Sequence, residues 1–461
     1  MSSSSDTPKL LVLGGGVCGL YGALEAQKIG VEVSLFEKES KLGGLASGHK
    51  LGENWYDLGV HMLHAFDQDV FETCKEAMAE ERIEVPLKAN IKWMGKEYRY
   101  PLRGRDILLG LPPVKLFRCV AGLLIAELTS PPKLAPEDED AETALIDMYG
   151  DPLYEFFFEE FTHRYWGIHP SKLSAEFVRR KMPRLSAVDV FKNLVGFLKI
   201  AKPKDAVEGA LRFETLHYAT TGCEALPRKL GEKVINQGGV VTSDAAVEVI
   251  YHKEGKIDSI EAQDQKFGSS NDVFLSTMPI TELVQKFSPA APTEVIEAAK
   301  FLRYKPMVVY ALLVKKEQCM EALYTYYRDY IFHRVGEPKN AGLEVKPAGY
   351  TTLIVEMTCE EGDAKWNDQR FNDVVRDLEK EGLCKREDIV EKHLISSRYA
   401  YPIFNKGFDQ HLKVIQDYLT TFSNLRSVGR QGAFTYPNMH SAMRMGAKGV
   451  KELLEGLDDS S

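Results

Sequence analysis

Three glycines and a later glutamate are the first residues whose types and spacing point to chemistry. Gly14, Gly16 and Gly19 fit the pattern G-x-G-x-x-G, which follows a short apolar run and precedes a stretch typical of a helix. Glu37 closes the next apolar run. The interval in sequence between Gly14 and Glu37 is close to the roughly 20 residues expected between such a turn and an acid that binds a ribose. The first glycine permits the tight turn, the second lets a pyrophosphate approach the backbone, and the third lets helix and strand pack closely. The pattern predicts dinucleotide binding, with a glycine-rich turn of no function as the alternative.

The elements that must position these residues are two buried strands and the helix between them. Residues 10–13 and 31–36 are the expected strands, and the helix begins near Leu20. This helix would present free N–H groups and the positive end of its dipole to the phosphates. Glu37 would accept hydrogen bonds from the ribose hydroxyls and repel a 2′-phosphate.

A second pair of glycines, Gly43 and Gly44, follows soon after the glutamate. With the first turn, the stretch Lys-Leu-Gly-Gly-Leu resembles the N-terminal FAD signature of the amine oxidase and protoporphyrinogen oxidase superfamily. The resemblance implies that the paired glycines let the backbone pass beside the FAD pyrophosphate and ribityl chain. A simple two-residue turn is the alternative. The same segment supplies further candidate cofactor-binding residues, which are Val17, Cys18, Lys38 and Leu45.

A third motif, D-x-G-x-H, comprises Asp57, Gly59 and His61. It resembles the matching segment of protoporphyrinogen-oxidase-like proteins and of UDP-galactopyranose mutases, where the glycine and histidine lie beside the flavin ring. The resemblance implies that Gly59 and His61 contact the cofactor, and it makes His61 the candidate catalytic residue. His61 and His64 are also spaced like metal ligands, but no cluster of Cys, Asp or Glu accompanies them, so we expect no metal site. A structural histidine is the other alternative.

The C-terminal segment carries a fourth motif, G-R-x-G-x-x-x-Y-x-N-M, which begins at Gly429. It resembles the C-terminal flavin motif of the same two families. The resemblance implies that Asn438 and Met439 open a helix whose amides point at the N1/O2 edge of the flavin. The positive end of that helix would stabilise an anionic reduced flavin. Gly429 and Arg430 are therefore candidate cofactor-binding residues.

The middle of the chain supplies two further cofactor candidates, Val247 and Thr277. In the family, the backbone of a valine at the position of Val247 meets the adenine. Thr277 follows residues 273–276, the expected strand that returns to the FAD sheet. One departure from the family pattern is Cys223, which stands where a second glycine is usual.

The candidate substrate residues come from three segments. The hairpin expected over residues 91–100 is followed by a Pro-Leu pair that resembles the substrate cleft of both families, and Arg103 comes next. Arg334 lies in a pattern Arg-x-x-Glu-x-Lys, which is similar to a segment of the galactopyranose mutases where the arginine meets substrate phosphate. A guanidinium suits a phosphate because its fork binds two oxygens, but a salt bridge at the end of a strand is the alternative. Tyr401 and Tyr436 complete this set.

The composition limits the function classes. The chain has 461 residues, of which 44% are hydrophobic and 27% charged, and this is ordinary for a globular protein with a sizeable core. A net charge of −9 argues against a nucleic-acid partner. The seven cysteines are scattered without a C-x-x-C pair, and the serine-rich N-terminus lacks the features of a signal peptide. We therefore expect reduced thiols and a cytoplasmic location.

No apolar stretch is long enough for an integral membrane segment. The nearest candidate, residues 107–128, is interrupted by prolines and charged residues. It is expected to be an amphipathic or buried helix, with contact at a membrane surface as the alternative.

The expected fold is an α/β Rossmann-like FAD-binding domain of the glutathione-reductase type with an inserted mixed α+β substrate domain. The FAD-binding domain would comprise residues 1–65, 213–282 and 423–461, and the substrate domain residues 66–212 and 283–422. The first functional hypothesis is an FAD-dependent oxidoreductase that takes a hydride from a small-molecule substrate stacked on the flavin. The second is a redox-neutral flavoenzyme that acts on a nucleotide sugar, like UDP-galactopyranose mutase. The third is a non-catalytic binding protein, like the GDP-dissociation inhibitors and Rab-escort proteins. Substrate, electron acceptor and oligomeric state stay open.

Overall fold

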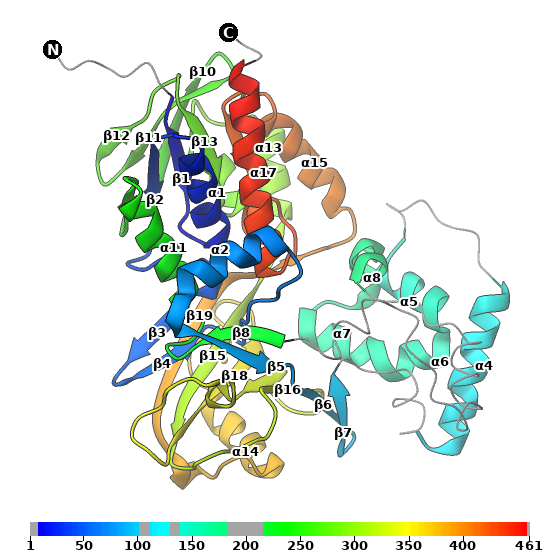
Figure 1. Cartoon of the computed structure of the whole chain (residues 1–461). Coiled ribbons are helices and arrows are strands. Elements are labelled where there is room, and N and C mark those ends of the chain that lie inside the picture. The colour runs from blue at the N-terminus through cyan, green and yellow to red at the C-terminus, as the bar shows by residue number, and fades with distance from the viewer. Residues whose placement is uncertain (1–7, 101–110, 130–138, 182–214, 459–461) are drawn as a thin grey trace.

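The computed structural model describes residues 8–100, 111–129, 139–181 and 215–458 (Figure 1). A five-stranded parallel sheet with the strand order β20-β13-β1-β2-β9 lies in the upper part of Figure 1. Its strands come from segments far apart in the sequence: β1 (Leu10–Leu13), β2 (Val33–Phe36), β9 (Val240–Thr242), β13 (Val273–Ser276) and β20 (Leu425–Ser427). The two strands expected around the glycine turn and the returning strand are confirmed. All four residues of β1 are buried because the strand has a neighbour on each side and both faces of its sheet are covered.

The first and last helices of the described chain pack directly against each other beside this sheet. Helices α1 (Val17–Lys28) and α17 (Met439–Asp458) lie side by side in Figure 1. At their crossing, a Cβ added to Gly446 would lie 2.2 Å from the carbonyl oxygen of Cys18, so only glycine fits there. Two more helices, α2 (Gln68–Met78) and α11 (Ala225–Asn236), complete this layer.

A second, four-stranded sheet covers the other side of the parallel sheet. Its order is β12-β11-β10-β14, and residues from both sheets form one apolar cluster that includes Phe36, Ile260 and Phe274. Strands β10 and β11 form an antiparallel hairpin around Gly255. The elements of this part are β10 (Val247–Lys253), β11 (Lys256–Ala262), β12 (Gln265–Phe267), β14 (Phe287–Ser288), α12 (Ile280–Leu283), α13 (Thr293–Phe301), α15 (Phe408–Leu419) and α16 (Gly429–Gly432).

A seven-stranded mixed sheet forms the lower part of Figure 1, with the order β19-β15-β18-β17-β16-β6-β7. The expected hairpin over residues 91–100 is confirmed as β6 and β7, and helix α14 packs with this sheet around Val374. The elements are β6 (Ala89–Trp93), β7 (Lys96–Tyr100), β15 (Arg303–Val314), β16 (Tyr324–Tyr327), β17 (Arg334–Gly336), β18 (Thr351–Thr358), β19 (Ile389–Ile403) and α14 (Phe371–Glu381). Two short antiparallel ladders join the sheets, β3 (Gly48–Leu51) with β4 (Asn54–Asp57) and β5 (Arg82–Pro86) with β8 (Thr215–Ala219).

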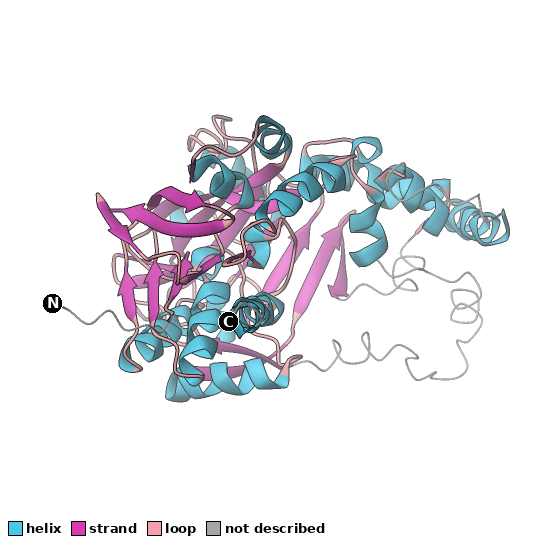
Figure 2. Ribbon diagram, turned by 90° about the horizontal axis from the view of Figure 1, so that it is seen from above, coloured by secondary structure: helices cyan, strands magenta, loops and turns pink. Residues whose placement is uncertain are grey.

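A group of helices extends to one side of the sheets (Figure 2). It comprises α4 (Pro113–Thr129), α5 (Ala141–Tyr149), α6 (Asp151–Leu153), α7 (Glu159–Trp166) and α8 (Ala175–Lys181), with a π-helical turn at Tyr154–Phe158. Phe157 is buried in the cluster that joins these helices to the seven-stranded sheet. Across the described ranges, no helix combines the length and the apolar character needed to cross a membrane.

Candidate active site

The first glycine turn folds over the carboxylate of Glu37. Gly14 has φ +114°, which favours glycine, and the amide of Gly15 donates a hydrogen bond of 2.7 Å to Glu37 Oε2. The amide of Glu39 donates to Oε1 at 2.9 Å. Burial raises the pKa of Glu37, and these two amide donors oppose that shift. The acid therefore sits at the turn, where a ribose-binding residue is expected.

The two glycine pairs face each other and leave open backbone between them. The amide of Gly43 donates to the carbonyl oxygen of Gly15 at 2.9 Å. A Cβ added to Gly16 would have Gly43 O as its nearest neighbour at 3.9 Å, and one added to Gly44 would have Gly16 Cα at 3.5 Å. Helix α1 begins directly after Gly16. A phosphate group can thus approach the backbone and the helix N-terminus together, so this cradle fits the pyrophosphate of a dinucleotide.

The C-terminal motif closes over the same turn. Gly429 has φ +84°, and a Cβ added there would lie 2.9 Å from Cys18 Sγ and 3.9 Å from Thr277 Cβ. The hydroxyl of Thr277 donates to the carbonyl oxygens of Leu13 and Gly14, at 3.3 and 3.2 Å. Residues predicted from the first, middle and last parts of the chain therefore meet at one turn.

A cleft lies where the start of α17 faces the D-x-G-x-H segment. His61 and Met439 line this cleft together with Tyr218 and Cys223. Helix α17 begins at Met439, and the amide of Ala442 donates to the carbonyl oxygen of Asn438 at 2.9 Å, so the expected helix start is confirmed. His61 is partly exposed as a residue, but its Nδ1 atom is buried and has no hydrogen-bond partner among the described residues. Burial, with the nearby charge of Arg334, lowers the pKa of His61 to about 4, so the imidazole is neutral at pH 7.

Glu356 connects the His61 segment to Arg334. Its side chain is fully buried and accepts hydrogen bonds from Arg334 Nε at 2.7 Å, Arg334 Nη2 at 2.6 Å and the Val60 amide at 3.1 Å. His333 Nε2 lies 3.7 Å from the same carboxylate. Burial alone would raise the pKa of Glu356, but the charge of Arg334 and the hydrogen bonds outweigh it and hold the pKa at about 2. The predicted alternative for Arg334, a salt bridge, is thus present.

Arg334 also faces a group of tyrosines that Arg430 approaches from another element. The guanidinium of Arg334 lies 5.6 Å from the ring of Tyr326, and that of Arg430 lies 4.0 Å from Tyr436 and 5.1 Å from Tyr401. The Tyr401 and Tyr436 rings are 5.5 Å apart. Arg430 Nη2 donates to the carbonyl oxygen of Ala400 at 2.7 Å, while its buried Nε has no partner among the described residues. Two guanidinium groups beside a single carboxylate leave the site with excess positive charge.

The other sequence-predicted residues lie at the edges of this arrangement. The amide of Ala245 donates to the Glu37 carbonyl oxygen at 2.8 Å, which places the buried Val247 near Glu37. Lys38 is exposed, with its Nζ 5.8 Å from the ring centroid of Tyr399, and Leu45 packs against the cluster that contains Tyr56. Gly19 lies in α1 against the turn, and Gly59 separates His61 from Glu356. Arg103 lies outside the described residues.

Sequence reasoning missed three side chains of the site, Glu356, Tyr326 and Tyr165. Glu356 had a usable signal, because a single carboxylate stands in the otherwise uncharged strand Thr351–Thr358. The tyrosines had none, because they belong to runs of aromatic residues that also fill cores. Among the described residues, no group of three or more His, Cys, Asp or Glu could hold a metal ion.

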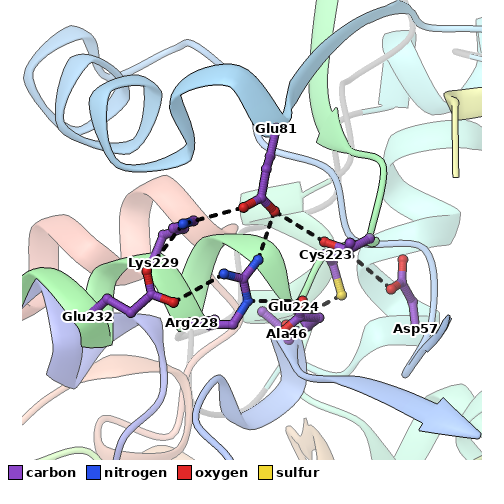
Figure 3. Close-up of polar contacts among 9 residues, drawn as sticks. Ala46, Asp57, Glu81, Cys223, Glu224, Arg228, Lys229 and Glu232 are labelled. Carbon is purple, nitrogen blue, oxygen red and sulfur yellow. Dashed lines mark hydrogen bonds and ion pairs between the residues drawn. The ribbon is translucent and has the colours of Figure 1, made fainter. Parts of the chain in front are cut away.

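A buried polar network holds the turn beside the cleft (Figure 3). Asp57 accepts from the Cys223 amide at 3.0 Å and from the hydroxyl of Tyr218. The Cys223 thiol donates to the carbonyl oxygen of Ala46 at 3.3 Å, next to the second glycine pair. Figure 3 also shows Arg228, whose guanidinium contacts the carboxylates of Glu81, Glu224 and Glu232. Burial raises the pKa of Asp57 to about 6, although both hydrogen bonds lower it.

Replacing Tyr218 with phenylalanine is expected to destabilise the protein by about 1–3 kcal/mol above pH 7, and by less at pH 5. The ionised form of Asp57 needs the hydroxyl donor most. The pKa of Asp57 is raised on folding, so the stability that its protonated carboxyl contributes is present at low pH and is lost as the pH rises through about 6. The ionised carboxylate, and with it the need for the Tyr218 donor, therefore appears in the folded protein only above that pH. Thermal unfolding from pH 5 to 8 measures the difference. The control is Tyr251→Phe, which removes a hydroxyl that donates to Glu261 away from this network; an equal loss at every pH for Tyr218→Phe would contradict the prediction.

Comparison with known proteins places these features in a family context. Residues 12–77 match the family described as NAD(P)-binding Rossmann-like domain. A dTDP-fucopyranose mutase of Escherichia coli is 23% identical over 188 residues, which are 39% of this chain and 48% of the mutase. The matched segment therefore spans about half the length of that relative.

Two solved structures resemble the chain over nearly its whole length. The crystal structure of a reduced UDP-galactopyranose mutase has a TM-score of 0.82 and 18% identity, and the match covers 97% of this chain and 94% of the mutase. A protein assigned as a protoporphyrinogen oxidase, from Exiguobacterium sp. 255-15, has a TM-score of 0.70 and 15% identity, with 99% and 100% covered. These likenesses confirm the predicted resemblance and fold class. Residues near the N-terminus thus match a NAD(P)-binding Rossmann-like domain, and the chain as a whole has the mixed α/β fold of these two solved structures.

Proposed function

We propose that the protein is an FAD-dependent enzyme that rearranges a nucleotide sugar without net oxidation. The observation that carries the proposal is the convergence of Arg334 and Arg430, with three tyrosine rings, beside the cleft lined by His61 and Met439. One guanidinium group can bind two oxygens of a phosphate at once. Tyrosines supply rings for stacking and hydroxyls for hydrogen bonds. A diphosphate-linked sugar suits this site. The likeness to two sugar mutases supports the same conclusion.

FAD fits the residues that the fold brings together. The open backbone at Gly16 and Gly44 would take the pyrophosphate, Glu37 the adenosine ribose, and the start of α17 the flavin ring. Bound reduced flavin would supply an electron-rich ring nitrogen as nucleophile toward the sugar. The chain's own part is to orient the substrate phosphates through its arginines and to keep a neutral imidazole, His61, at the cleft. We also propose the predicted discontinuous FAD domain, because strands of its three pieces share one sheet.

The first hypothesis from the sequence is an oxidoreductase that takes a hydride from its substrate. The positive charge of the site disfavours cationic substrates of such an enzyme and favours anionic ones. A cationic amine would meet two arginines and only one carboxylate, and that carboxylate is already occupied by Arg334. An anionic porphyrinogen would not meet this repulsion. Because the chain is similar to the Exiguobacterium protein, an oxidoreductase that acts on a porphyrinogen is the second candidate function, and the experiment below tests it. The third hypothesis, a binding protein without flavin, is tested by the absorption spectrum.

The experiment has two steps. The purified protein should show flavin bands near about 370 and 450 nm. Anaerobically reduced protein should then convert UDP-galactopyranose or dTDP-fucopyranose into its furanose isomer, detected by chromatography, while the flavin stays reduced. Bleaching of oxidised flavin by amines or porphyrinogens, without any isomerisation, would instead establish the oxidoreductase. A spectrum without flavin bands would contradict both enzyme hypotheses.

A further inference from the structure

A second cationic cleft lies behind the tyrosine group, between α7 and the chain that follows β18. Its walls include Arg164, His333 and Lys365, together with Thr358 and Tyr165. Tyr165 separates this cleft from the candidate active site, because its ring is also 5.6 Å from that of Tyr401. We call it the Arg164–Lys365 cleft.

Among the described residues, the side chains of Arg164 and Lys365 donate hydrogen bonds only to backbone carbonyl oxygens. Lys365 Nζ donates to the carbonyl oxygen of Thr358 at 3.0 Å, and Arg164 Nη2 donates to that of Phe332 at 3.5 Å. In the described part of the chain, neither cation has a carboxylate oxygen within 4.0 Å. Burial lowers the pKa of both side chains, so their charges are held at a cost.

The neighbouring acidic groups offset these cations only in part, and another buried cation lies close to them. Arg328 also lacks an ion pair among the described residues, and its guanidinium lies 5.1 Å from the ring of Phe161, which lines the cleft. Burial lowers the pKa of Arg328 to about 10, and the charge of Arg164 contributes to that shift. The acidic groups around the two cleft cations act only at longer range, and they are Glu160, Asp329, Asp363 and Asp377.

We propose that the Arg164–Lys365 cleft binds an oxyanion of the phosphate type. Such a ligand would accept hydrogen bonds from the guanidinium and the ammonium and relieve their mutual repulsion. His333 would sense the ligand, because it lines the cleft and its Nε2 lies 3.7 Å from Glu356 of the active site. The proposal does not depend on the reaction that the enzyme catalyses.

The test is a titration of the full-length purified protein with inorganic phosphate at constant ionic strength. Isothermal titration calorimetry measures the affinity. The location is reported by the part of the tryptophan fluorescence change that is lost in Trp366→Phe, because Trp366 is next to Lys365. We expect saturable binding whose affinity falls roughly tenfold or more in Lys365→Gln and in Arg164→Gln. Lys253→Gln, whose side chain is 81% exposed elsewhere, is the control and should bind like the wild type.

A parallel titration with UDP identifies the source of the phosphate. If the two variants bind both ligands, or UDP alone, with lower affinity than the wild type, the cleft is assigned to the phosphate of a nucleotide. If only the affinity for inorganic phosphate falls, the cleft is assigned to a free anion. Thermal unfolding shows that the variants are folded. Absence of saturable binding by either ligand would overturn the proposal, and so would unchanged affinity in both folded variants. Failure to isomerise sugars would leave this result unaffected.

Discussion

Glu356→Gln is expected to lower the free energy of unfolding by about 3 kcal/mol at pH 7. The substitution keeps the shape of the side chain but leaves the guanidinium of Arg334 in a buried position without its counter-charge. The Arg334 side chain is only 14% exposed, and the pairing of β17 with β18 places Arg334 opposite Glu356. Urea or thermal unfolding of the two proteins measures the loss.

The same pair predicts a pH dependence with a definite sign. The pKa of Glu356 falls on folding to about 2, so its contribution is present above the unfolded pKa and is lost as the pH falls toward 2. The difference in the free energy of unfolding between wild type and variant should therefore be about 1 kcal/mol smaller at pH 4 than at pH 7.

Two further variants separate charge pairing from general damage. Glu254→Gln removes an exposed carboxylate and should change the stability by less than about 0.5 kcal/mol. A double variant, Glu356→Gln with Arg334→Met, should recover part of the loss, since removing both charges is far less costly than removing one. A single variant as stable as the wild type across this pH range would show that the pair is not coupled.

The parts of the fold that could be predicted are those whose residues are local in sequence. The glycine turn, β1, α1 and Glu37 lie within the first forty or so residues, and each step follows from a residue type at a fixed spacing. The C-terminal helix start at Met439 was equally local. The continuous apolar runs of β1 and β13 fit their burial on both faces.

The fifteen-residue strand β19 was not predicted, and its position explains why. It lies at the edge of the seven-stranded sheet, and its first part alternates between exposed and partly buried residues with charges such as Glu391 and Lys392. The residue types in this segment form neither the apolar run of a central strand nor a regular alternation of apolar and polar residues.

The polar centre of the site depends on register, which the sequence does not display. Arg334 meets Glu356 because β17 and β18 are antiparallel neighbours, and Glu356 meets the Val60 amide across nearly 300 residues. A shift of one residue would turn Glu356 to the other face of the sheet. The sequence therefore identified Arg334 as a candidate but left its partner, and hence its orientation, undetermined.

Gly446→Ala should separate the first and last helices and lower both stability and flavin content. Its added Cβ would lie 2.2 Å from the Cys18 carbonyl oxygen and 3.3 Å from the Gly22 amide nitrogen, and neither backbone atom can move without its helix. We expect a loss of about 3 kcal/mol, at the upper end for overpacking. The start of α17 would move away from the glycine turn, so the flavin-to-protein absorbance ratio should fall as well.

Gly456→Ala in the same helix is the matched control, because a Cβ added there meets no atom within 4 Å. Alanine is a better helix former than glycine, so this variant should be unchanged or more stable by up to about 1 kcal/mol. Opposite signs for one substitution at two sites of α17 can arise only from the contact with α1. If Gly446→Ala kept its stability and its flavin, the close crossing of these helices would not be what joins the two ends of the chain around the cofactor site.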